Sequence, residues 1–169
     1  MTAEELRARQ SPLKDAYRAD PAKAQQVLRA EGVLDPENVA CRVETPEGVA
    51  EAGLHEAAGG DGHWACSGDM LLQSLAACAG VTLTAVARAL GINLRRGRVI
   101  AEGDLDWRGT LGVSKETPVG FSAIRLRFEI DSDATDEQRA NLLRLAERYC
   151  VIEQTLKNPP AITATIETV

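Results

Sequence analysis

Residues 70–87, MLLQSLAACAGVTLTAVA, form an uncharged stretch of eighteen residues with a cysteine, Cys78, at its middle. The large aliphatic side chains are diluted there by alanine, threonine, serine, glutamine and glycine, so the stretch is too polar to favour a membrane span. Its length and composition instead predict a central buried helix. A thiol in such a helix is either inert packing or a nucleophile recessed in an apolar pocket, and the rest of the sequence has to distinguish the two.

The composition is that of one soluble domain with few aromatic residues. The chain has 169 residues, of which 44% are hydrophobic, enough for a core built mainly from aliphatic side chains. Its net charge of −6 has no compensating basic block, because residues 95–98 hold only a short arginine cluster, so we expect no nucleic-acid partner. The N-terminus lacks the apolar stretch of a secretory signal. We therefore expect a cytoplasmic protein without structural disulfides among its four cysteines, Cys41, Cys66, Cys78 and Cys150.

The first thirty residues carry charges at helical spacing and predict an N-terminal helical arm. A break is expected at Pro12, because a proline interrupts helical hydrogen bonding. Residues 20–30 predict a second helix, since an Asp-Pro pair is typical of a helix start. The apolar stripe of this segment is thin. We therefore divide the chain into an arm of residues 1–36 and a domain of residues 37–169.

The domain alternates between strand and helix patterns. A period of two is clearest in residues 121–130, where every second side chain is apolar and would face the core. Further strands are predicted at residues 39–45, 49–56, 92–107 and 161–169, and helices at residues 67–90 and 133–149 and from Cys150 onward. Short turns join most successive strands, so the predicted fold class is α+β with a mostly antiparallel sheet.

Cys150 differs from the other cysteines because it directly follows the second core helix and is expected to begin a short new one. A thiol at a helix N-terminus has a lowered pKa, because the peptide dipoles stabilise its thiolate. Cys78 lies in the middle of its helix, where no helix N-terminus stabilises a thiolate. A cation from elsewhere in the fold, most economically an arginine, would therefore have to lie next to it. Cys41, on a predicted strand, is interpreted as packing.

Cys66 and His63 lie in the loop that leads into the long helix. Cys66 is a candidate for an alternative resolving thiol. The two residues have the spacing HxxC, but no second pair stands beside them, so no metal site is predicted. The glycine-rich residues 57–62 lack the lysine and the spacing of a phosphate-binding loop. We therefore predict no cofactor.

Two segments of the chain resemble the cysteine motifs of a known family. GGDGHWACSGDMLLQSLAACAG, residues 59–80, looks like the first cysteine motif of the OsmC/Ohr family, the osmotically inducible protein C and organic hydroperoxide resistance proteins. ERYCVIEQTL, residues 147–156, is similar to the second motif of that family, in which a cysteine begins a short turn of helix. The resemblance covers the chain from residue 39 onward and identifies it as a diverged OsmC-like member.

The resemblance implies an intertwined homodimer in which antiparallel sheets wrap around two long central helices, with a thiol pair at the subunit interface. It further implies that Cys78 is the peroxidatic cysteine, whose thiolate attacks an organic hydroperoxide and becomes a sulfenic acid. Cys150 would condense with it to a disulfide, and a dithiol reductant would restore both thiols. No membrane or nucleic-acid partner is implied.

The chain departs from the peroxidase branch of this family at the start of the long helix. That branch has Pro-Glu there, and its glutamate orients an arginine onto the thiolate, whereas this chain has Ser67 and Gly68, with Asp69 one residue later. Arg42, on the first predicted strand of the domain, is the candidate for the activating arginine. The alternative function is a non-peroxidase OsmC-like dimer that binds a small apolar ligand at the interface pocket and leaves its thiols unactivated.

Overall fold

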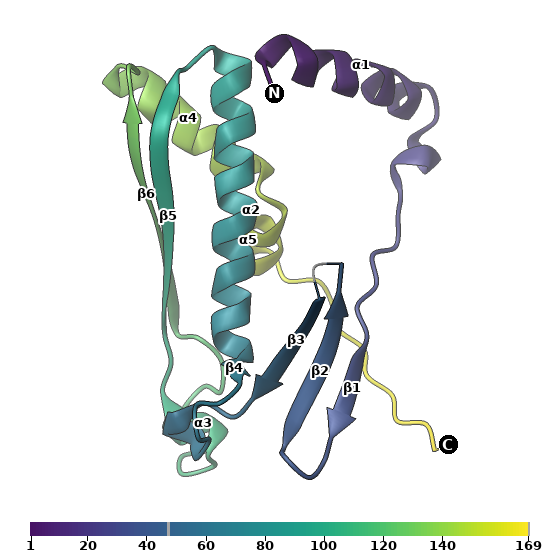
Figure 1. Cartoon of the computed structure of the whole chain (residues 1–169), viewed down its shortest axis with the longest axis vertical. Helices are drawn as coiled ribbons and strands as arrows, with labels where there is room; N and C mark the ends of the chain where they lie inside the picture. The colour runs from purple at the N-terminus through teal and green to yellow at the C-terminus, as the bar shows by residue number, and fades with distance from the viewer. Residues whose placement is uncertain (47, 169) are drawn as a thin grey trace. The chain divides into compact units, whose positions relative to one another are not determined.

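The computed structural model describes residues 1–46 and 48–168, which divide into two compact units. The first unit comprises Met1–Gln73 and Glu102–Arg125, and the second comprises Ser74–Ala101 and Leu126–Val169. Figure 1 shows the order of helices and strands along the chain. Both units contain helices and strands, which confirms the predicted α+β class.

The N-terminal helix α1 (Ala3–Ala19) lies in the first unit and continues through Pro12 without a break. A capping box begins it, in which Thr2 Oγ1 accepts the backbone N–H of Glu5 at 3.1 Å and the Glu5 carboxylate accepts that of Thr2 at 2.6 Å. The predicted interruption at Pro12 is therefore wrong. None of the residues of α1 is buried, so water can satisfy the carbonyl that the proline leaves unpaired.

The predicted second helix over residues 20–30 is wrong beyond Ala24. Asp20 caps only the short turn η1 (Pro21–Ala24), by accepting a backbone N–H at 3.2 Å. Val27 and Leu28 are 95% and 91% exposed, so this segment has no buried face that would stabilise a longer helix. The division of the chain at residue 36 stays a prediction.

A four-stranded sheet follows in the first unit. Its strands β1 (Gly32–Asp35), β2 (Ala40–Thr45) and β3 (Gly48–Gly53) pair antiparallel in that order, and β4 (Ala65–Cys66) pairs parallel to β3. The predicted strands on either side of Pro46 are thereby confirmed, while Glu47, in the predicted turn, lies outside the described residues. The sequence pattern does not reveal β1 and β4, because strands of four and two residues are too short to show an alternation.

The half-buried Cys41 lies on β2, where this strand pairs with β1. A Cβ atom added at Gly32 would lie 2.7 Å from Cys41 Sγ, a distance too short for a nonbonded contact. Glycine at position 32 therefore makes room for this sulfur, in agreement with the interpretation of Cys41 as packing. Two short helical turns, η2 (Glu56–Ala58) and α3 (Trp107–Thr110), complete the helices of the first unit.

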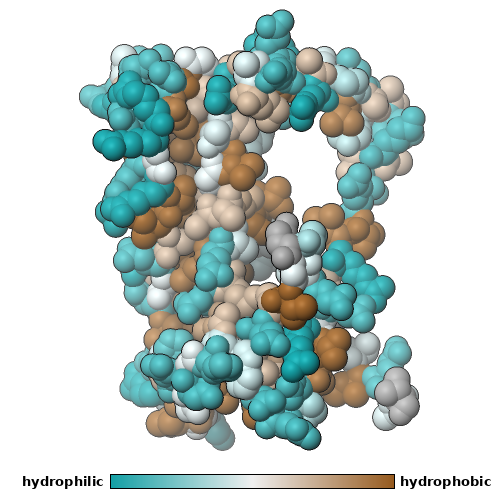
Figure 2. Space-filling view, in the orientation of Figure 1, coloured by the Kyte–Doolittle hydropathy of each residue, from teal (hydrophilic) through white to brown (hydrophobic). Residues whose placement is uncertain are grey.

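Helix α2 (Ser67–Leu90) carries Cys78 and has the predicted bounds, and Gly91, with a φ of +71°, follows its last residue. By length and composition this helix could cross a membrane, but core helices of soluble proteins pass the same test. One stripe of it is buried in the second unit, formed by Leu75, Ala79, Leu83 and Ala87. Burial is therefore one-sided: Val81 is 73% exposed, and pale and brown residues predominate along α2 in Figure 2.

The long strands β5 (Leu94–Asp104) and β6 (Ala123–Ser132) form a two-stranded sheet and run in opposite directions (Figure 1). Both confirm predicted strands, with bounds shifted by two or three residues. In the second unit this sheet lies against α2, because a Cβ added at Gly80 would be 3.4 Å from the Val99 side chain. Because Gly80 has no side chain at this point, α2 can approach β5 closely.

Helix α4 (Asp136–Tyr149) completes the core of the second unit. Its predicted start is confirmed by a capping box between Thr135 and Gln138. The buried core joins side chains of α2, α4 and the loops around the sheet, namely Leu83, Ala87, Ile92, Ala134, Leu142 and Ala146. Because α4 ends at Tyr149, this core also fixes the place of the residue that follows, Cys150.

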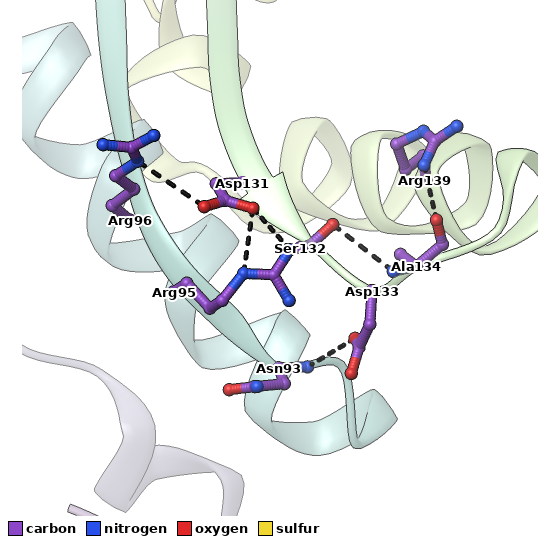
Figure 3. A network of polar contacts seen from close by, with 8 residues as sticks. All are labelled: Asn93, Arg95, Arg96, Asp131, Ser132, Asp133, Ala134 and Arg139. Carbon is purple, nitrogen blue, oxygen red and sulfur yellow. Dashed lines mark hydrogen bonds and ion pairs between the residues drawn. The ribbon is translucent and has the colours of Figure 1, made fainter.

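A polar network joins the start of β5 to the end of β6 (Figure 3). Arg95 Nε donates to Asp131 at 2.9 Å, Arg96 lies 3.5 Å from the same carboxylate, and the Asn93 N–H donates to Asp133 at 3.3 Å. The arginines are more than half exposed, so these pairs add little stability. Their position indicates that they hold the strand register just before the turn into α4.

The predicted C-terminal strand is wrong for residues 161–168, among which the structure assigns no strand. Val169, the last residue of that prediction, lies outside the described residues. Ile162 and Ile166 have the expected alternation but are 90% and 97% exposed. A strand requires a neighbour to accept and donate its backbone hydrogen bonds, and an alternating pattern alone cannot supply one.

Candidate thiol site

The second unit brings together the two cysteines singled out in the sequence. The thiols of Cys78, from the middle of α2, and Cys150, after α4, are hydrogen-bonded to each other. Cys78 is half-buried, and Cys150 is 0% exposed. All four cysteines of the chain are free thiols in the structure.

Local structure fixes each sulfur. Cys78 immediately precedes Ala79, which belongs to the buried stripe of α2, so its thiol lies at the edge of that stripe. Cys150 ends α4 and begins α5 (Val151–Lys157). Its N–H donates to the Ala146 carbonyl at 3.0 Å, and its own carbonyl accepts the Gln154 N–H at 2.9 Å. The backbone of Cys150 is thereby held from both helices.

Hydrogen-bond donors gather around the Cys78 sulfur. Burial raises the pKa of a thiol, but the Ile152 N–H, the Cys150 thiol, the Val151 N–H and the Thr82 side chain outweigh this effect, and the pKa of Cys78 is lowered. These donors come from α5, from the residue before it and from the next turn of α2. Cys78 is therefore the member of the pair that ionises more readily.

Cys150 has the opposite tendency. Its burial raises the pKa of its thiol, and the backbone N–H of Glu153 offsets this only in part. The hydrogen bond and negative charge of Cys78 and the charge of Glu153 raise the pKa of Cys150 further. The site therefore favours a thiolate on Cys78 beside a protonated thiol on Cys150, so the helix-start effect expected for Cys150 acts instead on Cys78.

Glu153 is the charged residue next to this pair. It is 8% exposed, and its Oε1 lies 2.7 Å from Lys157 Nζ. Among the residues that the structure describes, its Oε2 is the buried side-chain oxygen without a hydrogen-bond partner. Lys157 also lies 3.4 Å from the half-buried Glu147, and the Glu153 carboxylate raises the pKa of Lys157.

Arg42, the predicted activating arginine, lies on β2 in the first unit. Its guanidinium is 3.0 Å from Glu51 and 3.4 Å from Asp35, and its side chain is 57% exposed. Its catalytic role stays a prediction, as does a role for Asp69 in the first turn of α2. Cys66, the candidate alternative resolving thiol, is half-buried at the end of β4, also in the first unit.

Sequence reasoning missed three polar residues of the site: Thr82, Glu153 and Lys157. Thr82 follows Cys78 by four residues, a spacing that places both on the same side of a helix. Glu153 and Lys157 have the same spacing on α5. These spacings are visible in the sequence, but they do not reveal which of the side chains is buried.

Comparison with known families supports this pairing of motifs. The family model described as OsmC-like protein matches residues 60–165, a span that includes both Cys78 and Cys150. This chain belongs to the OsmC-like protein family. The resemblance stated from the two cysteine motifs is thereby confirmed. Comparison with curated protein sequences finds no match to this OsmC-like protein.

Solved structures share the fold of this OsmC-like protein at low sequence identity. An OsmC-like protein from Mycoplasma pneumoniae is 16% identical, with a TM-score of 0.66, over 80% of this chain and 90% of that one. A protein from Legionella pneumophila named organic hydroperoxide resistance protein OsmC is 18% identical, with a TM-score of 0.60, over 79% and 93% of the two chains. An organic hydroperoxide resistance protein from Elizabethkingia anophelis is 15% identical, with a TM-score of 0.57, over 80% and 92%. These likenesses confirm the OsmC-like fold.

Replacing Thr82 by valine is expected to raise the pKa of Cys78, because it removes one of the groups that stabilise the thiolate. Below that pKa the thiolate fraction should fall about threefold to tenfold, and the rate of alkylation by iodoacetamide should fall with it. Peptide mass spectrometry at several pH values measures the rate for Cys78 alone. Thr84→Val is the matched control, because the Thr84 hydroxyl donates to the Gly80 carbonyl at 2.8 Å. Equal rates in the Thr82 and Thr84 variants would contradict the prediction.

Proposed function

We propose that this OsmC-like protein is a thiol peroxidase that reduces organic hydroperoxides, with Cys78 as the nucleophile and Cys150 as the resolving thiol. The observation that carries the proposal is the hydrogen-bonded thiol pair, in which the pKa of Cys78 is lowered and the pKa of Cys150 is raised. A peroxidase needs this asymmetry, because one sulfur must attack as a thiolate while the other waits as a thiol.

In the first step the Cys78 thiolate attacks the outer oxygen of the hydroperoxide. A sulfur–oxygen bond forms, the O–O bond breaks, and the alkoxide leaves and takes a proton from solvent to become an alcohol. Two electrons pass from sulfur to oxygen, so Cys78 becomes a sulfenic acid. The backbone N–H groups of Val151 and Ile152 hold the sulfur in place for this attack.

In the second step Cys150 attacks the sulfenic sulfur of Cys78. The disulfide forms, the sulfur–oxygen bond breaks, and the departing hydroxide combines with the proton of Cys150 to leave as water. A dithiol reductant then attacks the disulfide, passes through a mixed disulfide and leaves oxidised, with both protein thiols restored. No cofactor takes part in this proposal.

Two further features of the proposal concern substrate and assembly. Some solved neighbours are named organic hydroperoxide resistance proteins, which supports an organic rather than an inorganic peroxide.

Apolar side chains on α2 and the C-terminal segment, such as Val81 and Ile166, are 73% and 97% exposed in a single chain. We propose that a homodimer covers such residues. Light scattering should then give a mass of about twice 18.1 kDa, and a monomeric mass would contradict it.

The test is to count thiols before and after a small excess of cumene hydroperoxide. We expect two thiols to be lost per chain, and peptide mapping to find a disulfide between Cys78 and Cys150. The Cys150→Ser variant should instead accumulate a sulfenic acid on Cys78, trapped with dimedone. No loss of thiols would favour the alternative, an OsmC-like protein with unactivated thiols. A disulfide between Cys78 and Cys66 would instead identify Cys66 as the resolving thiol and contradict that role for Cys150.

A further inference from the structure

The carboxylate of Glu153 is buried in the first turn of α5, the helix that Cys150 begins. A buried charge is costly unless hydrogen bonds and an opposite charge compensate it. Lys157 supplies the opposite charge to Oε1 at 2.7 Å, but among the described residues Oε2 has no hydrogen-bond partner. Among the residues that the structure describes, Glu153 is also the single polar or charged residue that is buried.

The position of Glu153 relative to the two sulfurs is asymmetric. Cys150 is the N-cap residue of α5, Glu153 follows it by three residues in the first turn of that helix, and the Glu153 backbone N–H donates to the Cys150 sulfur. The Cys78 sulfur instead accepts the N–H groups of Val151 and Ile152, the two residues before Glu153. The charge of Glu153 raises the pKa of Cys150, whereas the largest influences on the pKa of Cys78 are its burial and its hydrogen-bond donors. The carboxylate therefore distinguishes the two thiols.

The charged and titratable groups around Cys150 come from three helices. Cys78 is on α2, Glu153 and Lys157 are on α5, and Glu147 is on α4, where it contacts Lys157 at 3.4 Å. Lys157 is the cation of this set, and its shortest contact is with Glu153. Lys157 Nζ, 2.7 Å from Oε1, supplies the opposite charge that a buried carboxylate needs.

We propose that Glu153 is a positioning residue that keeps the one proton of the thiol pair on Cys150, so that Cys78 carries the thiolate. A negative charge beside Cys150 disfavours a second negative charge there. Its role in turnover rests on the proposed function, since a peroxidase needs Cys78 ionised to attack and Cys150 protonated to deliver the proton of water. The ionisation of the two thiols can be measured without any peroxide.

The experiment measures each thiol separately by thiolate absorbance at 240 nm as a function of pH. Cys150 is followed in a Cys78→Ser background and Cys78 in a Cys150→Ser background, with the double serine variant as the blank for the remaining cysteines and tyrosines. Adding Glu153→Gln to the Cys78→Ser background should move the midpoint for Cys150 down by about one pH unit, a tenfold larger thiolate fraction below it. The same change should leave the midpoint of Cys78 in place.

Two variants separate this role from simple loosening of the site. Lys157→Gln removes the cation that faces the Glu153 carboxylate, so it should move the Cys150 midpoint upward, opposite to Glu153→Gln. Loosening would expose Cys150 and move its midpoint down in both variants. Glu147→Gln, which changes the less buried acidic partner of Lys157, is the matched control and should have little effect.

The proposal is overturned if Glu153→Gln leaves the Cys150 midpoint unchanged, or if both variants lower it. If Glu153→Gln fails to fold, an upward shift in Lys157→Gln supports the proposal and any other result overturns it. Peroxide consumption by the unaltered protein is measured in parallel. If the two variants shift the Cys150 midpoint in opposite directions but the unaltered protein consumes no peroxide, the role of Glu153 in ionisation is supported and the proposed function is rejected. Failure of this proposal and failure of the proposed function are therefore distinguishable.

Discussion

Replacing Cys78 by serine is expected to lower the rate of organic hydroperoxide reduction by at least about a thousandfold. A serine hydroxyl is not ionised near neutral pH, so the N–H groups of Val151 and Ile152 would have no thiolate to stabilise. Dithiothreitol supplies the reducing equivalents, and loss of cumene hydroperoxide is followed directly. Cys41→Ser is the matched control, because Cys41 packs beneath Gly32 in the first unit, and it should keep most of the activity.

The Cys150→Ser variant refines this result. It should consume about one equivalent of hydroperoxide per chain quickly, because Cys78 can still be oxidised once, and then slow down. Steady turnover by the Cys78→Ser variant would assign the nucleophile elsewhere, with Cys150 or Cys66 as the remaining candidates. A Cys41→Ser variant that loses activity while it stays folded would contradict the packing role of Cys41.

Replacing Leu142 by alanine is expected to lower the free energy of unfolding by about 3 kcal/mol. Leu142 is 1% exposed and packs on α4 in the core that also includes Leu83 and Ala146. The substitution removes buried apolar atoms and leaves a cavity that close-packed neighbours fill only in part. Because Cys150 directly follows α4, the same change should also make the position of Cys150 beside Cys78 less well fixed.

Urea denaturation followed by far-UV circular dichroism measures this loss, at equal protein concentrations because an oligomer would make stability depend on concentration. Leu143→Ala is the matched control: the neighbouring leucine is 44% exposed, so its loss should cost well under about 1 kcal/mol. Equal losses for the two variants would show that the α4 face assigned to the core is wrong, or that an unseen partner buries Leu143 as well.

The helices were largely predictable because their signals are local. The uncharged residues 70–87 predict α2, and the segment that begins at Asp133 predicts α4, whose first helical residue is Asp136. The same local reasoning fails where neighbours decide. A thin apolar stripe cannot form a helix over residues 25–30, and the alternating residues 161–168 form no strand, because neither finds a surface that would stabilise it.

The candidate site was predictable only in its sulfurs. Both cysteines lie in motifs that resemble those of the OsmC-like family, and the structure brings them into hydrogen-bonding contact. The sequence suggested that a cation, with Arg42 as the candidate, would activate Cys78. In the second unit the groups that lower the pKa of Cys78 are hydrogen-bond donors, which include backbone N–H groups. Backbone donors carry no sequence signature, because every residue except proline has one.

The sequence by itself determined that Cys78 lies within a long apolar helix and that Cys150 begins a short one, since helix periodicity and capping depend on neighbours along the chain. Only the tertiary structure decided which thiol ionises. The packing of α5 beside α2 directs two backbone N–H groups to Cys78 and buries the Glu153 charge beside Cys150. Electrostatic stabilisation depends on distance in space and on burial, and neither quantity is written in the order of the residues.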